Sequence, residues 1–236
     1  MFSKSFAITV ALAFPVASAW ADTAMANETA DRQPVAAQYR ETRHVTGEDE
    51  ESADWYLIRQ RNQVEIIRGD YAEVWQRDER GELTLSRVFH GDRKLIQYTP
   101  GELRTQGRQN DWSVLNTVID PRLLSALKQV GTAIFLDRPA LRYEGKLGGE
   151  QIELLWLAEE GLVARLVRSN RDASVALDLK NLLSSPDASW PHSSLARTDG
   201  YAHLDGADLG DMEYDPFVQR VLAGDSAHGG HEHYAH

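Results

Sequence analysis

Residues 140–180 read ALRYEGKLGGEQIELLWLAEEGLVARLVRSNRDASVALDLK. Runs of β-prone residues alternate there with three short connections that are rich in glycine, acidic residues or asparagine. This spacing is typical of consecutive hairpins. It predicts four antiparallel strands, at 140–147, 151–157, 162–168 and 174–180.

The apolar residues of these runs alternate with polar ones. Successive side chains of a strand point to opposite faces, so the alternation separates an apolar face from a polar one. The residues on the apolar faces are Ile152, Leu154 and Trp156 in one strand and Val175, Leu177 and Leu179 in another. We expect these faces to line one concave surface.

Residues 53–98 show the same alternation of β-prone runs and turn residues. Five more runs are expected as strands, at 55–58, 64–67, 71–76, 83–89 and 95–98. Turn residues separate them, so this part is predicted to be an antiparallel meander. Both groups together give roughly eight to ten strands, and a sheet of that size must curl.

A different pattern separates the two groups of strands. Asp120 and Pro121 have the residue types that begin a helix, and Gly131 has the type that ends one. The apolar residues between them have helical spacing: Leu123, Leu124, Leu127 and Val130. This predicts an amphipathic helix that covers the sheet, with one or two helical turns before it at 112–119. The fold class is therefore α+β and β-rich, a curved antiparallel half-barrel covered by one or two helices.

The beginning of the chain has the features of an export signal. Lys4 precedes an apolar run at 6–16, and small residues at 19–21 suit a signal peptidase. We expect residues 1–21 to be removed and the protein to be exported. Residues 22–52 are polar and acidic, and they are expected to form a flexible leader.

Composition excludes several classes of function. The net charge is −11, which disfavours nucleic acid as a partner. The chain has no cysteine, so thiol chemistry, disulfides and lipid attachment to a thiol are excluded. The sequence has no second long apolar segment, which argues against an integral membrane protein.

Residues 53–183 resemble the periplasmic lipoprotein carriers LolA and LolB and their relatives. The resemblance rests on an exported, cysteine-free chain with a long meander, a helical insertion and the hairpins of residues 143–162. It implies a curved sheet and a helical lid that enclose an apolar cavity for acyl chains, and a periplasmic location. LolB proteins are anchored through a cysteine that this chain lacks, which disfavours that branch. The resemblance transfers no individual binding residue.

The C-terminal residues 225–236 are rich in histidine. The candidate metal ligands there are His228, His231, His233, His236 and Glu232. Neutral imidazole is a common ligand of zinc, copper and nickel. The alternative is a solvated end that binds metal only adventitiously.

Residues 186–224 are expected to form an acidic loop and a helix. The loop contains Asp205, Asp208, Asp211 and Glu213, which are interpreted as a solvated surface. Asp215 and Pro216 have the residue types of a helix start. The helix residues expected on one face are Phe217, Val218, Val221 and Leu222, and Gly224 is the expected end.

No catalytic motif supports an enzyme. The sequence lacks a nucleophile elbow, a zinc-protease motif and a phosphate-binding loop. His90, near Asp92, is the best isolated acid or base candidate, but an exposed histidine in a turn is the simpler interpretation. The large rings are expected to fill the core, although some of them can line a ligand cavity: Trp55, Trp75, Trp112 and Trp156.

These patterns predict an exported, non-enzymatic carrier with an apolar cavity for a lipid-like ligand or a lipoprotein. Its partner is then an apolar ligand or another exported protein. The alternative is a periplasmic protein that binds or delivers zinc, copper or nickel through its C-terminal histidines.

The metal alternative has a direct test. We expect micromolar or tighter binding of Zn(II), Cu(II) or Ni(II) that disappears when residues 228–236 are removed. Binding weakens as pH falls through the range in which imidazole is protonated. Calorimetric titration of the full-length and truncated proteins checks this, and equal binding by both contradicts it.

Overall fold

The computed structural model describes residues 32–108 and 110–228, so the predicted signal peptide at 1–21 lies outside the described residues. The strands are β1 (Val35–Val45), β2 (Glu51–Arg59), β3 (Gln63–Arg68), β4 (Tyr71–Arg77), β5 (Leu83–Phe89), β6 (Lys94–Tyr98), β7 (Lys128–Phe135), β8 (Arg138–Leu147), β9 (Glu150–Leu157), β10 (Leu162–Ser169), β11 (Ala173–Leu183) and β12 (Ala202–Asp205). The helices are α2 (Pro100–Thr105), α3 (Trp112–Thr117), α4 (Arg122–Ala126), α5 (Leu195–Thr198), the 3-10 helix η1 (Gly206–Gly210) and α6 (Pro216–His228).

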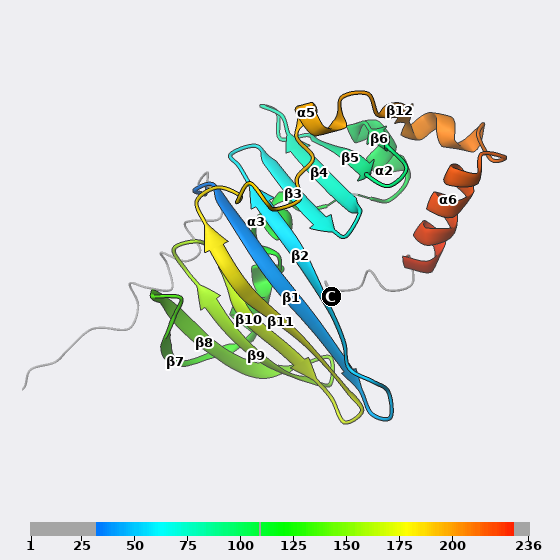
Figure 1. Ribbon diagram of the computed structural model, residues 1–236. Coiled ribbons are helices and arrows are strands. Elements are labelled where there is room, and N and C mark those ends of the chain that lie inside the picture. Colours follow the sequence, from blue (N-terminus) through cyan, green and yellow to red (C-terminus); the bar gives the residue numbers. More distant parts are fainter. Residues whose placement is uncertain (1–31, 109, 229–236) are drawn as a thin grey trace, which may run out of the picture. The chain divides into compact units, whose positions relative to one another are not determined.

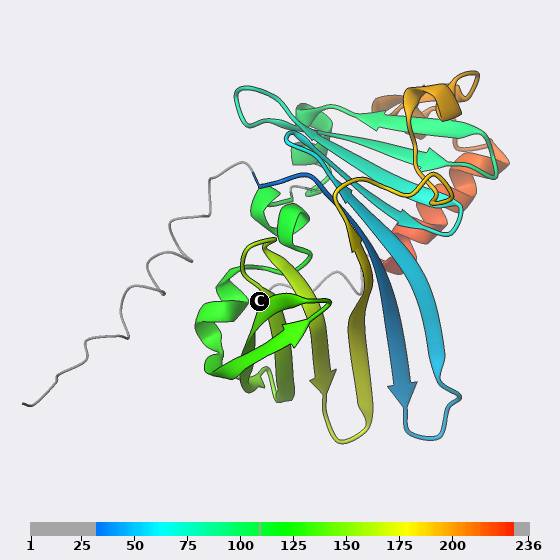
Figure 2. The same cartoon turned by 60° about the vertical axis from the view of Figure 1, so that its left-hand side comes forward.

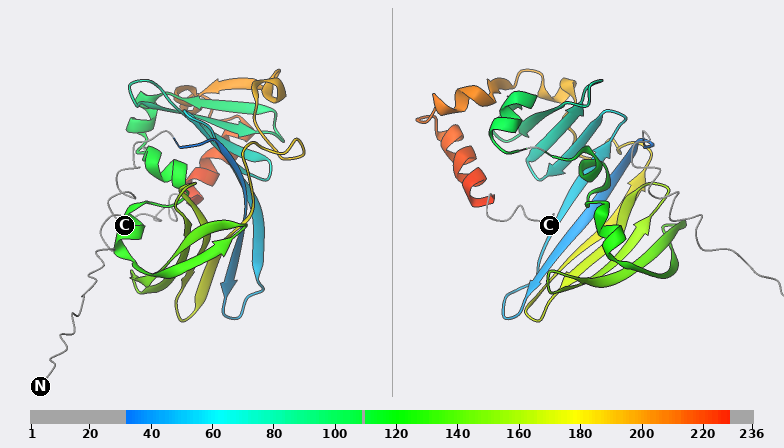
Figure 3. Two further views of the ribbon diagram at one scale, coloured as in Figure 1. Left: turned by 90° about the vertical axis from the view of Figure 1, so that its left-hand side faces the viewer. Right: turned by 180° about the vertical axis from the view of Figure 1, so that it is seen from behind.

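All twelve strands of the described residues belong to one sheet. Their order is β12-β6-β5-β4-β3-β2-β1-β11-β10-β9-β8-β7. Figure 1 shows β1 in the middle, between β2 and β11. The sheet is open and curved, and α3 and α4 lie on its concave side (Figures 2 and 3). The predicted β-rich half-barrel with few helices is therefore confirmed.

The hairpins form where the turn residues predicted them. Gly148 and Gly149 connect β8 to β9 with φ angles of 58° and 87°. Only glycine adopts two such angles in succession at little cost, so this pair fixes the turn and the register of both strands. All nine strands expected within 55–98 and 140–180 are present.

The flexible leader predicted at 22–52 is wrong for its second half. β1 occupies residues 35–45, and β2 already begins at Glu51. The first residues of β1 are Val35, Ala36 and Ala37, which are at most 7% exposed. Small side chains pack closely in the middle of the sheet, so this alanine-rich segment is a central strand despite its low β-propensity.

The helix predicted at 120–130 is much shorter than expected. α4 contains only residues 122–126, and Leu127 is already extended, with φ −105° and ψ 154°. Val130 belongs to β7 and is 44% exposed. The backbone after Leu127 pairs with β8, so strand pairing outweighs the helical spacing of the apolar residues. The helix expected at 112–119 is present as α3.

The segment 186–224 is not separate from the sheet. β12 pairs in parallel with β6 and forms one edge of the sheet. α6 begins as predicted, because the Asp215 carboxylate accepts a hydrogen bond of 2.7 Å from the backbone N–H of Phe217. The helix continues past Gly224 to His228, beyond its predicted end. Within the described residues, no helix is long and apolar enough to cross a membrane.

Both faces of the sheet carry buried side chains. Trp55, Trp75 and Trp156 are at most 5% exposed, and Trp112 packs against the main cluster. Their predicted place in the core is confirmed. On the β2 to β6 part of the other face, Ile58, Ile67 and neighbouring residues form a second buried cluster. Trp190 packs against it, so the connection that follows β11 covers this face.

Arg59 joins three parts of the fold. Its side chain is buried, and its guanidinium donates hydrogen bonds to the backbone oxygens of Asn116 (2.6 Å), Gln33 (3.2 Å) and Glu160 (2.7 Å). These oxygens belong to α3, to the residues before β1 and to the β9–β10 turn. The Arg59 guanidinium therefore connects α3 with both halves of the sheet.

We expect Arg59→Met to lower the free energy of unfolding by roughly 2–4 kcal/mol, because it leaves three carbonyl oxygens without their donor. Arg80→Met is the matched control, since Arg80 is exposed in the β4–β5 turn. Urea unfolding of both variants measures the difference. Equal stabilities contradict the role assigned to Arg59.

Candidate functional site

A row of apolar side chains crosses four neighbouring strands on the concave face. Tyr143 lies opposite Leu154, Leu154 opposite Leu166, and Leu166 opposite Leu177. Directly opposite residues share a face, so the row is continuous across β8 to β11. We call these four residues the leucine row. Leu154 is buried, whereas Tyr143, Leu166 and Leu177 are only half-buried.

Part of this row is predicted from the sequence. Ile152, Leu154 and Trp156 were predicted on one face of a strand, and all three are buried in one cluster. The half-exposed state of the row was not predictable, because it depends on how much of the face the cover leaves open.

The cover over the leucine row is short. Leu123 and Leu124 of α4 are half-buried and pack against the same cluster as the row. None of the five residues of α4 is buried. At its N-terminus the Asp120 carboxylate accepts a hydrogen bond of 2.8 Å from the backbone N–H of Arg122. A helix this short has little stability of its own. The cover is therefore held mainly by its apolar contacts with the sheet.

A close contact marks one end of this cover, and a strained backbone conformation marks the other. Leu127 follows α4 and is 8% exposed. A Cβ atom at Gly145 of β8 would lie 2.7 Å from the Leu127 Cδ2 atom, so the absence of a side chain at Gly145 lets Leu127 approach the sheet. At the other end, Val118 joins α3 to the following loop with a φ of 74°. A β-branched residue rarely adopts this conformation, which marks a strained junction.

Charged groups border the leucine row. The next pairs along the strands place Arg168 beside Val175 on one side and Ile152 on the other. Arg168 forms an ion pair of 2.6 Å with Glu150. On β1, Glu41 lies opposite Leu177. The apolar face thus ends at a rim of charges.

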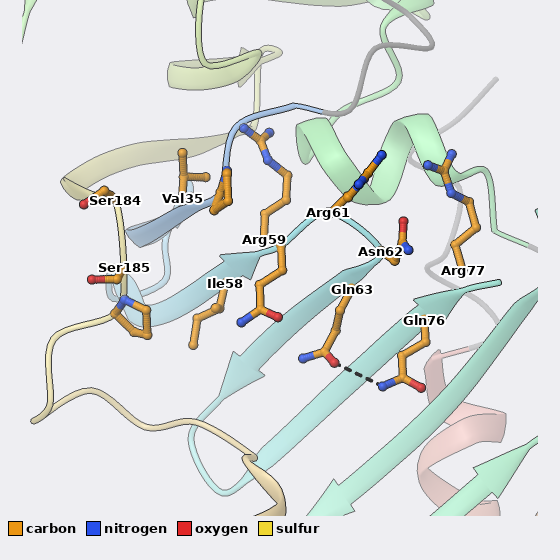
Figure 4. A pocket seen from close by; sticks show the side chains of 13 residues that line it. Val35, Ile58, Arg59, Arg61, Asn62, Gln63, Gln76, Arg77, Ser184 and Ser185 are labelled. Atoms are coloured by element: carbon orange, nitrogen blue, oxygen red, sulfur yellow. Dashed lines mark hydrogen bonds between the residues drawn. The ribbon is translucent and has the colours of Figure 1, made fainter. Parts of the chain in front are cut away.

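A pocket of about 630 Å³ lies at the ends of β2, β3 and β4. Most of the described residues that line it are of polar type, among them Arg59, Arg61, Gln63, Gln76 and Arg77 (Figure 4). It therefore differs from the enclosed apolar cavity that the sequence predicts beneath a helical lid. That cavity stays a prediction.

His90 lies on the face of the sheet opposite to the leucine row and is not an exposed turn residue as predicted. It is half-buried. Its Nδ1 atom is 3.1 Å from the Tyr201 hydroxyl, and its Nε2 atom is 3.1 Å from the Ser193 hydroxyl. The backbone N–H of Ser193 donates a 2.5 Å hydrogen bond to the buried Glu65 carboxylate. The contacts of His90 and Glu65 hold the connection after β11 against the sheet.

Burial perturbs both titratable groups of this contact. It lowers the pKa of His90, and the nearby positive charge of Arg197 lowers it further. Burial raises the pKa of Glu65, against the hydrogen bonds from Ser193. The folded protein therefore favours a neutral imidazole at His90.

The predicted metal ligands lie at or beyond the end of the described residues. His228 is the last residue of α6, and His231, Glu232, His233 and His236 lie outside the described residues. Among residues 32–108 and 110–228, no group of three or more histidine or acidic side chains is arranged to hold a metal ion. The C-terminal metal site stays a prediction.

Comparison with known proteins adds a weak structural likeness. No family model matches the chain, and no curated protein sequence matches it. A structure of PNGF-II is similar with a TM-score of 0.40 and 12% identity, over 78% of this chain and 33% of that chain. The Pseudomonas aeruginosa MucA/MucB complex is similar with a TM-score of 0.37 and 17% identity, over 74% of this chain and 60% of that chain.

A LolA superfamily protein from Nitrosomonas europaea is also similar, with a TM-score of 0.30 and 6% identity, over 72% of this chain and 92% of that chain. The superfamily that residues 53–183 resemble is therefore among these solved structures. The chain spans about a third of the PNGF-II chain, to judge by the 33% covered. Likeness at these scores says nothing about a ligand, so the function is inferred from this chain's own residues.

We expect the free energy of unfolding to fall as pH is lowered from about 6.5, the usual pKa of histidine. The pKa of His90 is depressed in the folded state. Its contribution is therefore present above the unfolded pKa and is lost as pH falls through the folded pKa. Urea unfolding at several pH values measures the slope. A His90→Gln variant loses this part of the slope, and an identical profile in the variant contradicts the assignment.

Proposed function

We propose that this chain is an exported, non-enzymatic carrier that binds a lipid-like ligand on the leucine row. The half-exposed state of Tyr143, Leu166 and Leu177 carries the proposal. These side chains form one apolar face, and the cover above them is short and has no buried residue in α4. An apolar ligand that enters between cover and sheet removes their remaining surface from water, which is the main source of affinity for such ligands.

The strength of this effect indicates the size of the ligand. Micromolar affinity requires about 8 kcal/mol. Each methylene group removed from water contributes about 0.8 kcal/mol, so about ten methylene groups are needed. A long acyl chain meets this requirement and a short organic acid does not. The proposal therefore names long-chain lipids or the acyl groups of lipoproteins.

The cover provides an entry route. α4 has no buried residue, and Val118 holds a strained conformation at the junction with α3. Movement of α4 away from the sheet exposes Leu123 and Leu124 together with the row. An acyl chain can replace the contacts that these two leucines make. The periplasm is the proposed location. Export rests on the predicted signal of residues 1–21, and the periplasm rests on the resemblance of residues 53–183 to periplasmic carriers.

Binding of a fluorescent long-chain fatty acid tests the proposal. We expect Leu177→Gln and Leu124→Gln to weaken its binding roughly tenfold or more, because an unpaired amide then faces the acyl chain. Leu83→Gln is the matched control, since Leu83 is also half-buried but lies on β5, on the other half of the sheet. Fluorescence titration gives the dissociation constants.

Two outcomes contradict the proposal. If the wild-type protein does not bind the probe saturably, the carrier proposal fails. If all three variants bind like the wild type, a ligand site exists but does not lie on the leucine row. Circular dichroism of each variant confirms that the fold is retained.

A further inference from the structure

β7 forms one edge of the sheet, beyond β8 (Figure 1). Within residues 32–108 and 110–228, no strand pairs with the other side of β7. The opposite edge strand, β12, has only four residues, whereas β7 has eight. A long edge strand presents a row of N–H and C=O groups that can pair with a further strand. β7 is therefore the edge of this sheet that offers the longer pairing surface.

Exposed apolar side chains gather at this edge. Seven large apolar side chains are exposed among the described residues, and three of them belong to β7 and to the turn after it. These three are Val130 at 44%, Ile134 at 73% and Leu136 at 42%. Such a concentration on one short segment is typical of a surface that another molecule covers.

β7 has little of the protection that edge strands usually carry. Charged residues, proline and bulges are the common devices against pairing with another chain. Lys128, the first residue, is the only charged residue of β7, and the strand contains no proline. Its register shift lies between Gln129 and Gly131, so residues 131–135 keep a regular edge.

The turn from β7 to β8 determines which backbone groups point outward. It has two residues, with φ angles of 46° and 60°, so Phe135 and Arg138 close the hairpin as a hydrogen-bonded pair. The next pair, Ile134 with Pro139, is then not hydrogen-bonded, which agrees with the missing N–H of proline. Because the two kinds of pair alternate, the N–H and C=O groups of Ile134 and Thr132 point away from β8.

These features are self-complementary about a two-fold axis at Thr132. Antiparallel pairing of two copies places Thr132 opposite itself and Val130 opposite Ile134 of the second copy. All three side chains are exposed, and residues two apart share a face, so the apolar ones bury each other. Lys128 then comes beside the turn that holds Asp137 of the second copy, and both of these residues are exposed. The match of apolar and charged groups favours a second copy over an unrelated strand.

We propose that two copies of this chain associate by antiparallel pairing of β7 with β7 of the second copy. One continuous sheet then runs through both molecules, and the two-fold axis closes the assembly as a dimer. The contact is confined to one edge strand and its turn, so we expect the association to be reversible. The inference does not rest on the carrier proposal, because it uses no residue of the leucine row.

Sedimentation equilibrium over a range of protein concentrations tests the proposal. We expect the average mass of the wild type to rise towards that of a dimer. Ile134→Lys places a charge in the contact, and Thr132→Pro removes an outward N–H, so each should raise the dissociation constant roughly tenfold or more. Tyr214→Lys is the matched control, since Tyr214 is 84% exposed but lies outside the sheet. It should associate like the wild type.

Single-cysteine variants test the register, because the chain has no cysteine of its own. Thr132→Cys places two thiols opposite each other across the two-fold axis, at a Cα separation that a disulfide can span. We expect mild oxidation to link this variant into a covalent dimer. Thr84→Cys is the matched control, because Thr84 is also an exposed threonine on a strand but lies in β5, inside the sheet. It should give at least tenfold less dimer.

Three results overturn the proposal. They are a wild type that stays monomeric up to about 1 mM, a dimer that Ile134→Lys leaves unchanged, and equal cross-linking of Thr132→Cys and Thr84→Cys. A monomeric wild type would leave the β7 edge to a strand of a different protein. Circular dichroism verifies the fold of each variant, and Ile134→Lys decides the test if Thr132→Pro does not fold.

Discussion

The pairing of β1 on both of its sides is the constraint on which the rest of the structure depends. Residues 36–45 pair with β11, and residues 35–43 pair with β2. Every other antiparallel pair joins strands that follow each other in the sequence. Without β1, the described strands would form two separate groups, and each would lack a neighbour at its longest strand. Arg59 reinforces this joint, because it binds the backbone just before β1 and the turn between β9 and β10.

The hairpins were predictable from the sequence because their signals are local. The glycine pair at 148–149 and the alternation in 151–157 define a turn and a buried face without reference to the rest of the chain. β7 was missed because its turn to β8 has Leu136 and Asp137 at positive φ angles, 46° and 60°, where glycine or asparagine is the usual signal. β1 was missed because its alanines are favourable only in the middle of a sheet.

The candidate sites were predictable to different degrees. Alternation identified Leu154 and Leu177 as apolar-face residues, but the continuous row also required the register of three strand pairs. The pocket had no sequence signal at all. Arg59 and Arg77 end two strands that come together at one end of the sheet only after folding, and a scan for motifs treats them as ordinary surface cations. His90 was misjudged for the same reason, because Ser193 and Tyr201 are about a hundred residues away along the chain, as the separations of 103 and 111 show.

The position of β1 also has a consequence for the order in which the chain folds. Its partner β11 is contributed by residues 173–183, so the central pairing forms only after three quarters of the polypeptide has been synthesised. Until then β1 can pair with β2 of the meander but lacks its second partner, and contacts so distant in sequence slow folding. A late closing step leaves unpaired strand edges exposed to aggregation during that time.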